Sequence, residues 1–137
     1  MNIDQATAVR KDWSSICDSV IREKPHFIKR TRDEMVLSSF ETMLSLLKEY
    51  RFTASRCDES DGSVSLCLHE IDLVVNGTTI EIAKKNMSLA IIEYAEEYYE
   101  NYSEYSHAPN RKDHLPYVMK ALLFQNPDSL SEEISCA

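Results

Sequence analysis

The sequence predicts an α+β protein built from two modules, and three observations lead to this fold class. Stretches with helical apolar spacing alternate with short runs of strand residues, without a long linker, in a chain of 137 residues. Hydrophobic residues make up 43% of the chain, enough for one core or two small ones. Residues 1–56 carry ten Lys and Arg against eight Asp and Glu, whereas residues 57–137 carry five against fifteen. We therefore expect modules at 1–50 and 51–137 with different partners.

The first module is expected to open with an amphipathic helix over residues 7–23. Thr7 is the expected N-cap, because its hydroxyl can accept a hydrogen bond from a free N–H of the first turn. The helix should end before Pro25, since the residue preceding a proline disfavours helical dihedral angles. One face of the helix would carry the apolar residues Val9, Trp13, Ile16, Cys17 and Val20.

A hairpin and a second helix are expected to complete this module. Two short strands at 26–30 and 34–37 flank residues 31–33, which would form the turn. The segment Ser38-Ser39-Phe40-Glu41 then resembles a capping box and predicts a helix that reaches about Glu49.

A small antiparallel sheet is expected at the beginning of the second module. Strands are predicted at 52–56 and 63–70, with a turn at 58–62, and a third apolar run follows at 71–75. Asn76-Gly77 is a strong turn dipeptide and should close that run.

A long helix should follow, capped by Thr78 or Thr79. Short helices are expected from Pro116 and Pro127, because proline suits the first helical turn, and the last residues are expected to fray. The stripe that keeps the helical period in the long helix comprises Ala83, Met87, Ala90, Ile91, Tyr94 and Tyr98.

The sequence predicts no enzyme, cofactor or metal site. A chain with two glycines could hardly build a phosphate-binding loop, and its four cysteines form no C-x-x-C pair. His69 and Glu70 should point to opposite faces of a strand, and no activated nucleophile accompanies His107 and His114. A carboxylate-based active site would require one pocket to gather Glu70 or Asp72 with a histidine.

We expect a cytoplasmic protein that does not enter a membrane. The sequence has no run of 18 apolar residues, and its N-terminal segment lacks the apolar core of a signal peptide. Four cysteines without an export signal fit a reducing compartment, in which disulfides are rare.

Basic residues of the first module form a candidate DNA-binding patch. Arg10 and Lys11 are expected in the first turn of their helix, where the macrodipole disfavours cations unless an anion lies nearby. Together with Lys29, Arg30 and Arg32 of the hairpin, they could form one patch suited to phosphate groups. The alternative is a basic surface that faces only water.

The helical segment 92–105 is a candidate docking surface for a basic protein. It contains five glutamates and five tyrosines without a basic residue, so it would repel nucleic acid. Carboxylates pair with Arg and Lys, and tyrosine is common at interfaces. The alternative is that half of the tyrosines belong to the core while the glutamates are solvated. The candidate partner-binding residues are Glu93, Glu96, Glu97, Tyr99, Glu100, Tyr102 and Glu104.

Three segments follow one another in an order that is typical of one family. They are Val9-Arg10-Lys11-Asp12-Trp13, Phe27-Ile28-Lys29-Arg30 and Met35-Val36-Leu37-Ser38-Ser39-Phe40-Glu41. In this order, residues 2–48 resemble the N-terminal domain of Phd/YefM-type antitoxins, which has a strand–helix–strand–strand–helix fold. Thr31-Arg32-Asp33 stands where that family commonly has a hairpin glycine.

The resemblance implies a homodimer whose first modules bind operator DNA and repress their own operon. By position, Thr7, Arg10 and Lys11 would face the DNA, while Arg30 and Arg32 would add phosphate contacts. The partner would be a cognate basic toxin of the RelE or ParE kind.

The second half departs from typical members, which continue as a disordered tail that folds on the toxin. Residues 61–66 and 73–83 are instead similar to HicB-type antitoxins, which carry a turn into a helix and a small RNase-H-like sheet without catalysis. This weaker resemblance spans roughly residues 52–100. It implies a Phd-like antitoxin whose acidic half is folded.

Together these features predict an antitoxin of a type II toxin–antitoxin system. Residues 1–50 would dimerise and bind operator DNA, and residues 51–137 would hold the toxin. The alternative is an adaptor or immunity-type protein that sequesters one basic partner without binding DNA.

Overall fold

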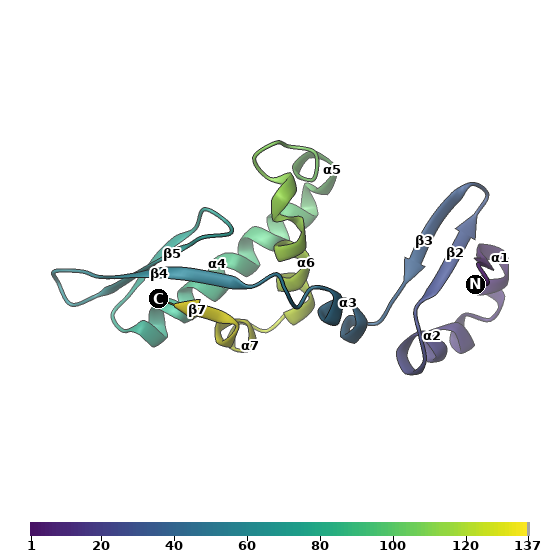
Figure 1. Ribbon diagram of the computed structural model, residues 1–137, viewed down its shortest axis with the longest axis horizontal. Helices are drawn as coiled ribbons and strands as arrows, with labels where there is room; N and C mark the ends of the chain where they lie inside the picture. Colours follow the sequence, from purple (N-terminus) through teal and green to yellow (C-terminus); the bar gives the residue numbers. More distant parts are fainter. Residues whose placement is uncertain (137) are drawn as a thin grey trace. The chain divides into compact units, whose positions relative to one another are not determined.

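Two separate β-sheets organise the chain (Figure 1). The computed structural model describes residues 1–136, and it divides into one unit over residues 1–46 and another that begins at Leu47. Each unit combines a sheet with helices, so the predicted α+β class is confirmed.

The first unit contains a three-stranded sheet in the order β1-β2-β3. Strand β1 pairs in parallel with β2, and β2 and β3 form the expected antiparallel hairpin. Its elements are β1 (Asp4–Gln5), α1 (Ala6–Lys11), α2 (Trp13–Arg22), β2 (His26–Arg30), β3 (Asp33–Leu37) and α3 (Phe40–Leu46).

The single helix expected over residues 7–23 is two helices that meet at Asp12. Thr7 is not an N-cap, because α1 already begins at Ala6, directly after Gln5 pairs with Lys29 of β2. The capping role predicted near Ser39 is present, since the Ser39 hydroxyl accepts the Thr42 N–H at 3.1 Å. However, α3 ends at Leu46 rather than near Glu49.

The hairpin turn consists of Thr31 and Arg32 between the paired residues Arg30 and Asp33. Thr31 has a φ of 56°, and Arg32 is not among the residues with positive φ. A positive φ followed by a negative one is the pattern of a type II′ turn, which favours glycine at its first position. Thr31 therefore occupies a backbone conformation that suits glycine and is strained for a β-branched residue.

We expect Thr31→Gly to stabilise the first unit by about 0.5–1 kcal/mol. Glycine removes a left-handed strain of about 1–2 kcal/mol, and the larger entropy of the unfolded chain offsets part of that gain. Trp13 is the one tryptophan of the sequence, so its fluorescence in urea reports on this unit. The matched control is Thr42→Gly in the first turn of α3, which should destabilise because a helix disfavours glycine. An unchanged or lower midpoint for Thr31→Gly would contradict the turn assignment.

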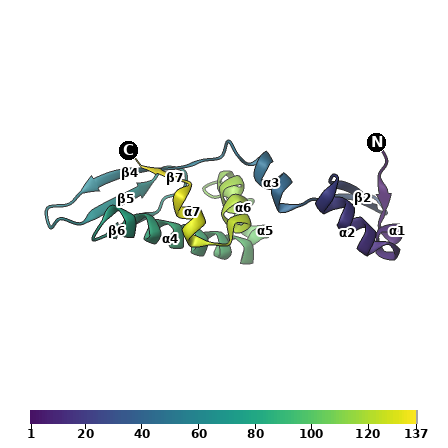
Figure 2. The same cartoon turned by 90° about the horizontal axis from the view of Figure 1, so that it is seen from below.

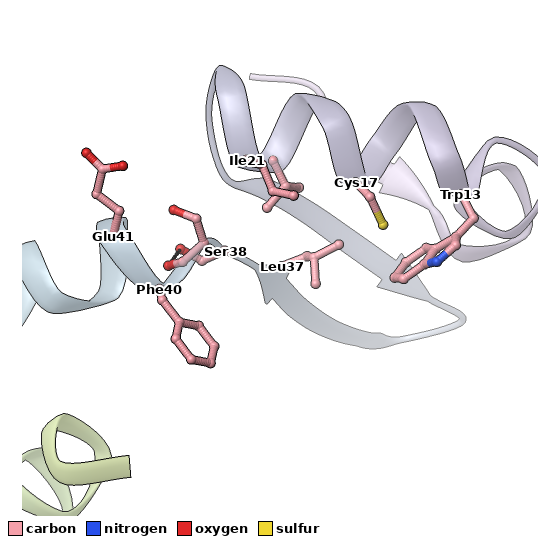
Figure 3. A pocket seen from close by; sticks show the side chains of 9 residues that line it. Trp13, Cys17, Ile21, Leu37, Ser38, Phe40 and Glu41 are labelled. Atoms are coloured by element: carbon pink, nitrogen blue, oxygen red, sulfur yellow. Dashed lines mark hydrogen bonds between the residues drawn. The ribbon is translucent and has the colours of Figure 1, made fainter. Parts of the chain in front are cut away.

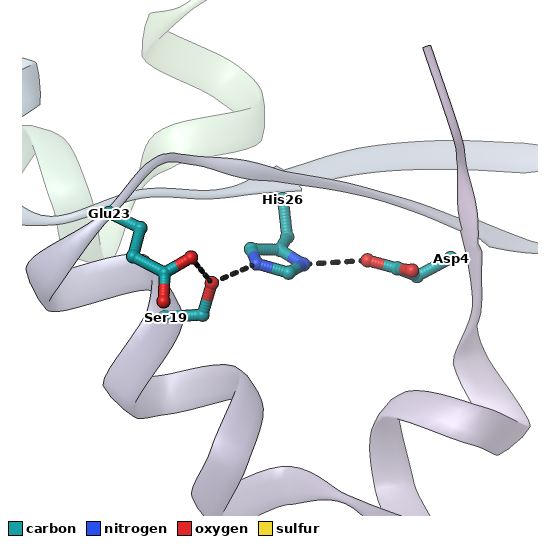
Figure 4. Close-up of polar contacts among 4 residues, drawn as sticks. All are labelled: Asp4, Ser19, Glu23 and His26. Carbon is teal, nitrogen blue, oxygen red and sulfur yellow. Dashed lines mark hydrogen bonds and ion pairs between the residues drawn. The ribbon is translucent and has the colours of Figure 1, made fainter.

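A polar cluster around His26 ties three elements of the first unit together (Figure 4). Its Nδ1 lies 2.6 Å from Oδ2 of Asp4 on β1, and its Nε2 lies 2.8 Å from Oγ of Ser19 on α2. The Ser19 hydroxyl donates in turn to Glu23 at 3.3 Å. The cluster helps to fix β1, and so the start of α1, against the hairpin.

The second unit contains a four-stranded sheet in the order β6-β5-β4-β7. The sheet is mixed rather than purely antiparallel, because β7 pairs in parallel with β4. The chain end that was expected to fray forms this strand. The elements are β4 (Phe52–Asp58), β5 (Val64–Leu68), β6 (Val74–Gly77), α4 (Ile80–Glu100), α5 (Tyr102–Tyr105), the 3₁₀ helix η1 (Lys112–His114), α6 (Leu115–Phe124), α7 (Pro127–Glu132) and β7 (Ile134–Cys136).

The core of the second unit lies between its sheet and its helices, which Figure 2 shows on one side of the strands. Thr79 caps α4 as expected, accepting the Ile82 N–H at 3.2 Å. Lys120 of α6 is 4% exposed, and its ammonium donates to the carbonyl of Tyr50 at 2.9 Å, which anchors the segment before β4. The buried side of α4 carries Ala83, Met87, Ser88, Ile91, Ala95 and Tyr98.

Asn76 and Gly77 belong to strand β6 instead of forming the predicted turn. Gly77 is buried and pairs with Val64 of β5. A Cβ at this position would collide with the backbone of Ala83, the residue that begins the buried stripe of α4. The glycine therefore permits close packing of the helix on the strand.

Within residues 1–136, no helix is long and apolar enough to cross a membrane. The same residues contain no group of three or more His, Cys, Asp and Glu side chains that could hold a metal ion.

Candidate DNA-binding and protein-binding surfaces

The basic residues singled out in the first unit lie on α1, at the end of β2 and in the turn, and we call this part of the unit its basic end. Strand β1 runs parallel to β2 and ends opposite Lys29, so α1 begins beside the end of β2 that leads into the turn (Figure 1). Helix α1 carries Thr7, Arg10 and Lys11, and the turn that follows β2 carries Arg32. All four side chains are exposed. None of the three cations forms an ion pair within the described part of the chain.

Two details differ from the sequence-based expectation. Arg10 and Lys11 lie in the last turn of α1, not in the first. The macrodipole favours cations there, so their position no longer indicates a nearby anion. On β2, Arg30 shares a sheet face with Ile28, whereas Lys29 points to the opposite face, where Glu34 is its cross-strand neighbour. Lys29 is therefore not on the same face as Arg30.

The first unit leaves much of its apolar surface exposed. Its buried hydrophobic side chains are Val9, Val20 and Ile28, whereas Trp13 is 53% exposed and Ile21 67%. Sequence periodicity assigned Trp13 to a core-facing stripe, and periodicity alone does not distinguish a core from an interface. The other large exposed hydrophobic side chains of β2, β3 and α3 are Phe27, Met35, Val36, Phe40 and Leu46.

Two apolar grooves shape this surface. One, of about 450 Å³, lies where Trp13, Cys17 and Ile21 project from α2 toward Leu37 of β3 (Figure 3). The other, of about 590 Å³, lies between α1 and the hairpin and includes Arg10 and Met35 in its lining. Trp13 and Leu37 line both grooves, so we refer to the two together as the apolar surface of the first unit.

The glutamates singled out in the second unit lie on an exposed face of α4. Glu93, Glu96, Glu97 and Glu100 are spaced so that they share one side of the helix, and all four are exposed. The helix ends at Glu100, and Glu104, also exposed, lies on the separate α5. Within the described residues, none of these carboxylates forms an ion pair.

The five tyrosines of this segment divide between the core and the surface. Tyr99 is 63% exposed and Tyr102 44%, so both predicted contact tyrosines are accessible. Tyr98 is fully buried, and burial raises the pKa of its hydroxyl. Tyr94 and Tyr105 are partly buried, and the Tyr105 hydroxyl donates to Glu97 at 3.1 Å.

Sequence reasoning missed that Ile82 and Leu89, also exposed, lie on the same side of α4 as the glutamates.

His69 and Glu70 converge on Thr53 rather than pointing to opposite faces. Strand β5 ends at Leu68, so strand alternation no longer applies to them. Glu70 accepts the Thr53 N–H at 2.7 Å, and Nδ1 of His69 lies 2.9 Å from the Thr53 hydroxyl. These bonds tie the end of β5 to β4.

The side chain of His107 is exposed, and its Nδ1 atom lies 2.7 Å from the backbone carbonyl oxygen of Ser103.

Comparisons with known proteins give the family. No curated protein matches the chain in sequence. One similar solved structure is described as the antitoxin part of a toxin/antitoxin system from Syntrophomonas wolfei subsp. wolfei. Its sequence is 31% identical to this chain, and the two structures superpose with a TM-score of 0.89 over 100% of this chain and 99% of that chain. The model of a family described as PHD-like antitoxins of RelE/RelB toxin–antitoxin systems matches residues 1–136. Members of this family are antitoxins and not enzymes. The resemblance to Phd-like antitoxins is thereby confirmed, and the chain belongs to the PHD-like antitoxin family of RelE/RelB systems.

Proposed function

We propose that this antitoxin represses its own operon as a DNA-bound dimer and neutralises a basic RelE- or ParE-like toxin. The observation that carries the proposal is the separation of exposed charge between the two units. Exposed cations without an ion pair in the described residues lie on α1 and the hairpin of the first unit, and exposed carboxylates without one lie along α4 of the second. DNA and a basic protein are the partners that these two surfaces fit, and both would be met in the cytoplasm.

Dimerisation is proposed through the apolar surface of the first unit. Five large hydrophobic side chains that line the two grooves are at least half exposed: Trp13, Ile21, Met35, Val36 and Phe40. A contiguous apolar surface with grooves is typical of a protein interface. A second copy is the occupant that suits it, because a symmetric dimer would also double the number of cations offered to DNA.

DNA binding is proposed at the basic end of the first unit. The exposed side chains of Thr7, Arg10 and Lys11 on α1, and of Arg30 and Arg32 on the hairpin, would contact phosphate groups. Lys29 is half-buried on the other sheet face, so we expect a smaller contribution from it.

Toxin binding is proposed on the exposed side of α4 and on α5. Glu93, Glu96, Glu97, Glu100 and Glu104 would pair with Arg and Lys of the toxin. Tyr99 and Tyr102 would supply apolar contact area with few rotatable bonds.

The double variant Glu96→Lys with Glu100→Lys is expected to weaken the toxin complex by roughly 30-fold, because each reversed exposed charge costs about 1 kcal/mol. The antitoxin would be coexpressed with the product of the neighbouring gene, and the affinity measured by calorimetry on the purified proteins. Glu132→Lys with Glu133→Lys makes the same change of net charge beyond α4 and should have little effect. Equal weakening by both pairs would indicate an effect of net charge, and no weakening by the first pair would refute the α4 surface.

A further inference from the structure

A cavity of about 190 Å³ in the second unit has no part in the proposed function. It lies between the segment that follows β5, helix α4 and the segment around η1. The residues that line it are Ile71, Asp72, Leu73, Tyr94, Asn110, Arg111 and His114.

Aromatic side chains hold Arg111, the cation of this cavity, in place. Its Cζ atom lies 3.9 Å from the ring centroid of Tyr105 and 5.8 Å from that of Tyr94. The hydroxyl of buried Tyr98 donates to the Arg111 carbonyl at 3.2 Å, which fixes the backbone as well. The contact of its Cζ with the face of the Tyr105 ring is a cation–π interaction, which restricts the movement of the guanidinium.

The N–H groups of Arg111 are incompletely paired within residues 1–136. Its Nη1 atom is buried and has no hydrogen-bond partner there, and the guanidinium forms no ion pair with any described carboxylate. An arginine remains charged at physiological pH, so a half-buried guanidinium is stabilised by an acceptor that completes its hydrogen bonds.

We propose that this cavity binds one carboxylate group, held by the guanidinium of Arg111. A carboxylate is planar and can accept two parallel N–H bonds from arginine, and the Asn110 side chain can donate to the same oxygen atoms. The cavity is smaller than the roughly 300–1,000 Å³ of pockets for drug-sized ligands. It suits a small organic acid or a single Asp or Glu side chain of a protein.

Two titratable neighbours restrict the charge of the ligand. Asp72 is exposed at the cavity, and its negative charge repels an anion. Burial lowers the pKa of His114, although the Asp72 carboxylate opposes that shift, and this disfavours the charged imidazolium. Because Arg111 then supplies the positive charge, the cavity favours a singly charged carboxylate over a doubly charged phosphate.

The test is a titration of the ¹⁵N-labelled full chain with sodium acetate at constant ionic strength, followed by NMR. Saturable shifts of the amide signals of residues 110–114 are expected. Arg111→Gln should weaken acetate binding by about tenfold or more, and Asp72→Asn should strengthen it by about threefold. Lys112→Gln removes an exposed cation beside Arg111 and is the matched control, with an expected change of less than about twofold.

Comparing the affinities of acetate, a glutamate-containing peptide and inorganic phosphate distinguishes the possible ligands. Tighter binding of acetyl-Gly-Glu-Gly-amide than of acetate would assign the site to a protein side chain, and equal or weaker binding would assign it to a small acid. Tighter binding of inorganic phosphate would overturn the carboxylate assignment. Shifts that do not saturate, or that are the same in Arg111→Gln, would overturn the site. Asp72→Asn tests the same point if Arg111→Gln does not fold, because weaker or unchanged acetate binding in that variant would also overturn it.

Discussion

Trp13→Glu is expected to convert the proposed antitoxin dimer to a monomer, with the Kd for dimerisation raised about a thousandfold. Trp13 lines both grooves of the apolar surface and is 53% exposed in the single chain. In a symmetric dimer each interface residue occurs twice. Loss of a buried aromatic anchor costs about 2 kcal/mol per copy, and about 1.4 kcal/mol corresponds to a tenfold change in Kd.

Sedimentation equilibrium over a range of concentrations measures this Kd. The matched control is Phe27→Glu, which introduces the same charge at another exposed aromatic residue of the same unit. Phe27 is adjacent to Ile28 on β2 and so lies on the opposite face of the sheet. If Phe27→Glu were monomeric while Trp13→Glu remained dimeric, the interface would lie on the face that carries Phe27. If both variants remained dimeric, neither face would be the dimer interface.

Elements with local causes could be predicted from the sequence. The stripe from Ala83 to Tyr98 and the cap at Thr78 or Thr79 predict the start and the buried side of α4, because both signals lie within the helix itself, whereas its end at Glu100 falls before the predicted residue 105. The hairpin of β2 and β3 also follows from short apolar runs around a turn. The glutamates of α4 are exposed because they stand opposite that stripe.

Features that depend on distant residues could not be predicted. Strand β7 exists because Ile134 pairs with Phe52, which is far away in the sequence. Gly77 looks like a turn residue until the helix that packs on it is known. The cavity around Arg111 combines segments from three parts of the chain, and a polar loop in the sequence gives no sign that the guanidinium will stack on Tyr105.

The exposure of the apolar surface of the first unit could not be predicted for a different reason. Trp13 and Cys17 have the spacing of a core-facing helical stripe, and they do face the hairpin. The first unit is too small to cover them, so the same pattern that predicts a core produces an exposed surface. Whether such a stripe is covered by its own chain or by a second copy depends on the size of the unit as much as on the sequence of the helix.

The double variant Arg10→Ala with Arg32→Ala is expected to lose binding to operator DNA while its fold is unchanged. Both side chains are exposed and unpaired within the described residues, so their removal should not disturb packing. A dimer would lose four phosphate contacts. Each contact contributes about 0.9 to the slope of log K against log salt, so affinity should fall roughly a thousandfold at 0.15 M salt.

Gel shifts with the DNA upstream of the antitoxin gene, repeated at several salt concentrations, measure both quantities. Arg22→Ala with Lys24→Ala removes the same charge from the first unit near the start of β2, at the end of the hairpin away from the turn. Long-range attraction depends on total charge, whereas contact with phosphate depends on position. A slope reduced by about four in the first variant, with little change in the second, is therefore the result that distinguishes a DNA-contacting surface from a basic surface that faces water. Equal losses in both variants would assign the effect to net charge, and unaltered binding by the Arg10 and Arg32 variant would exclude the basic end as the DNA-binding surface.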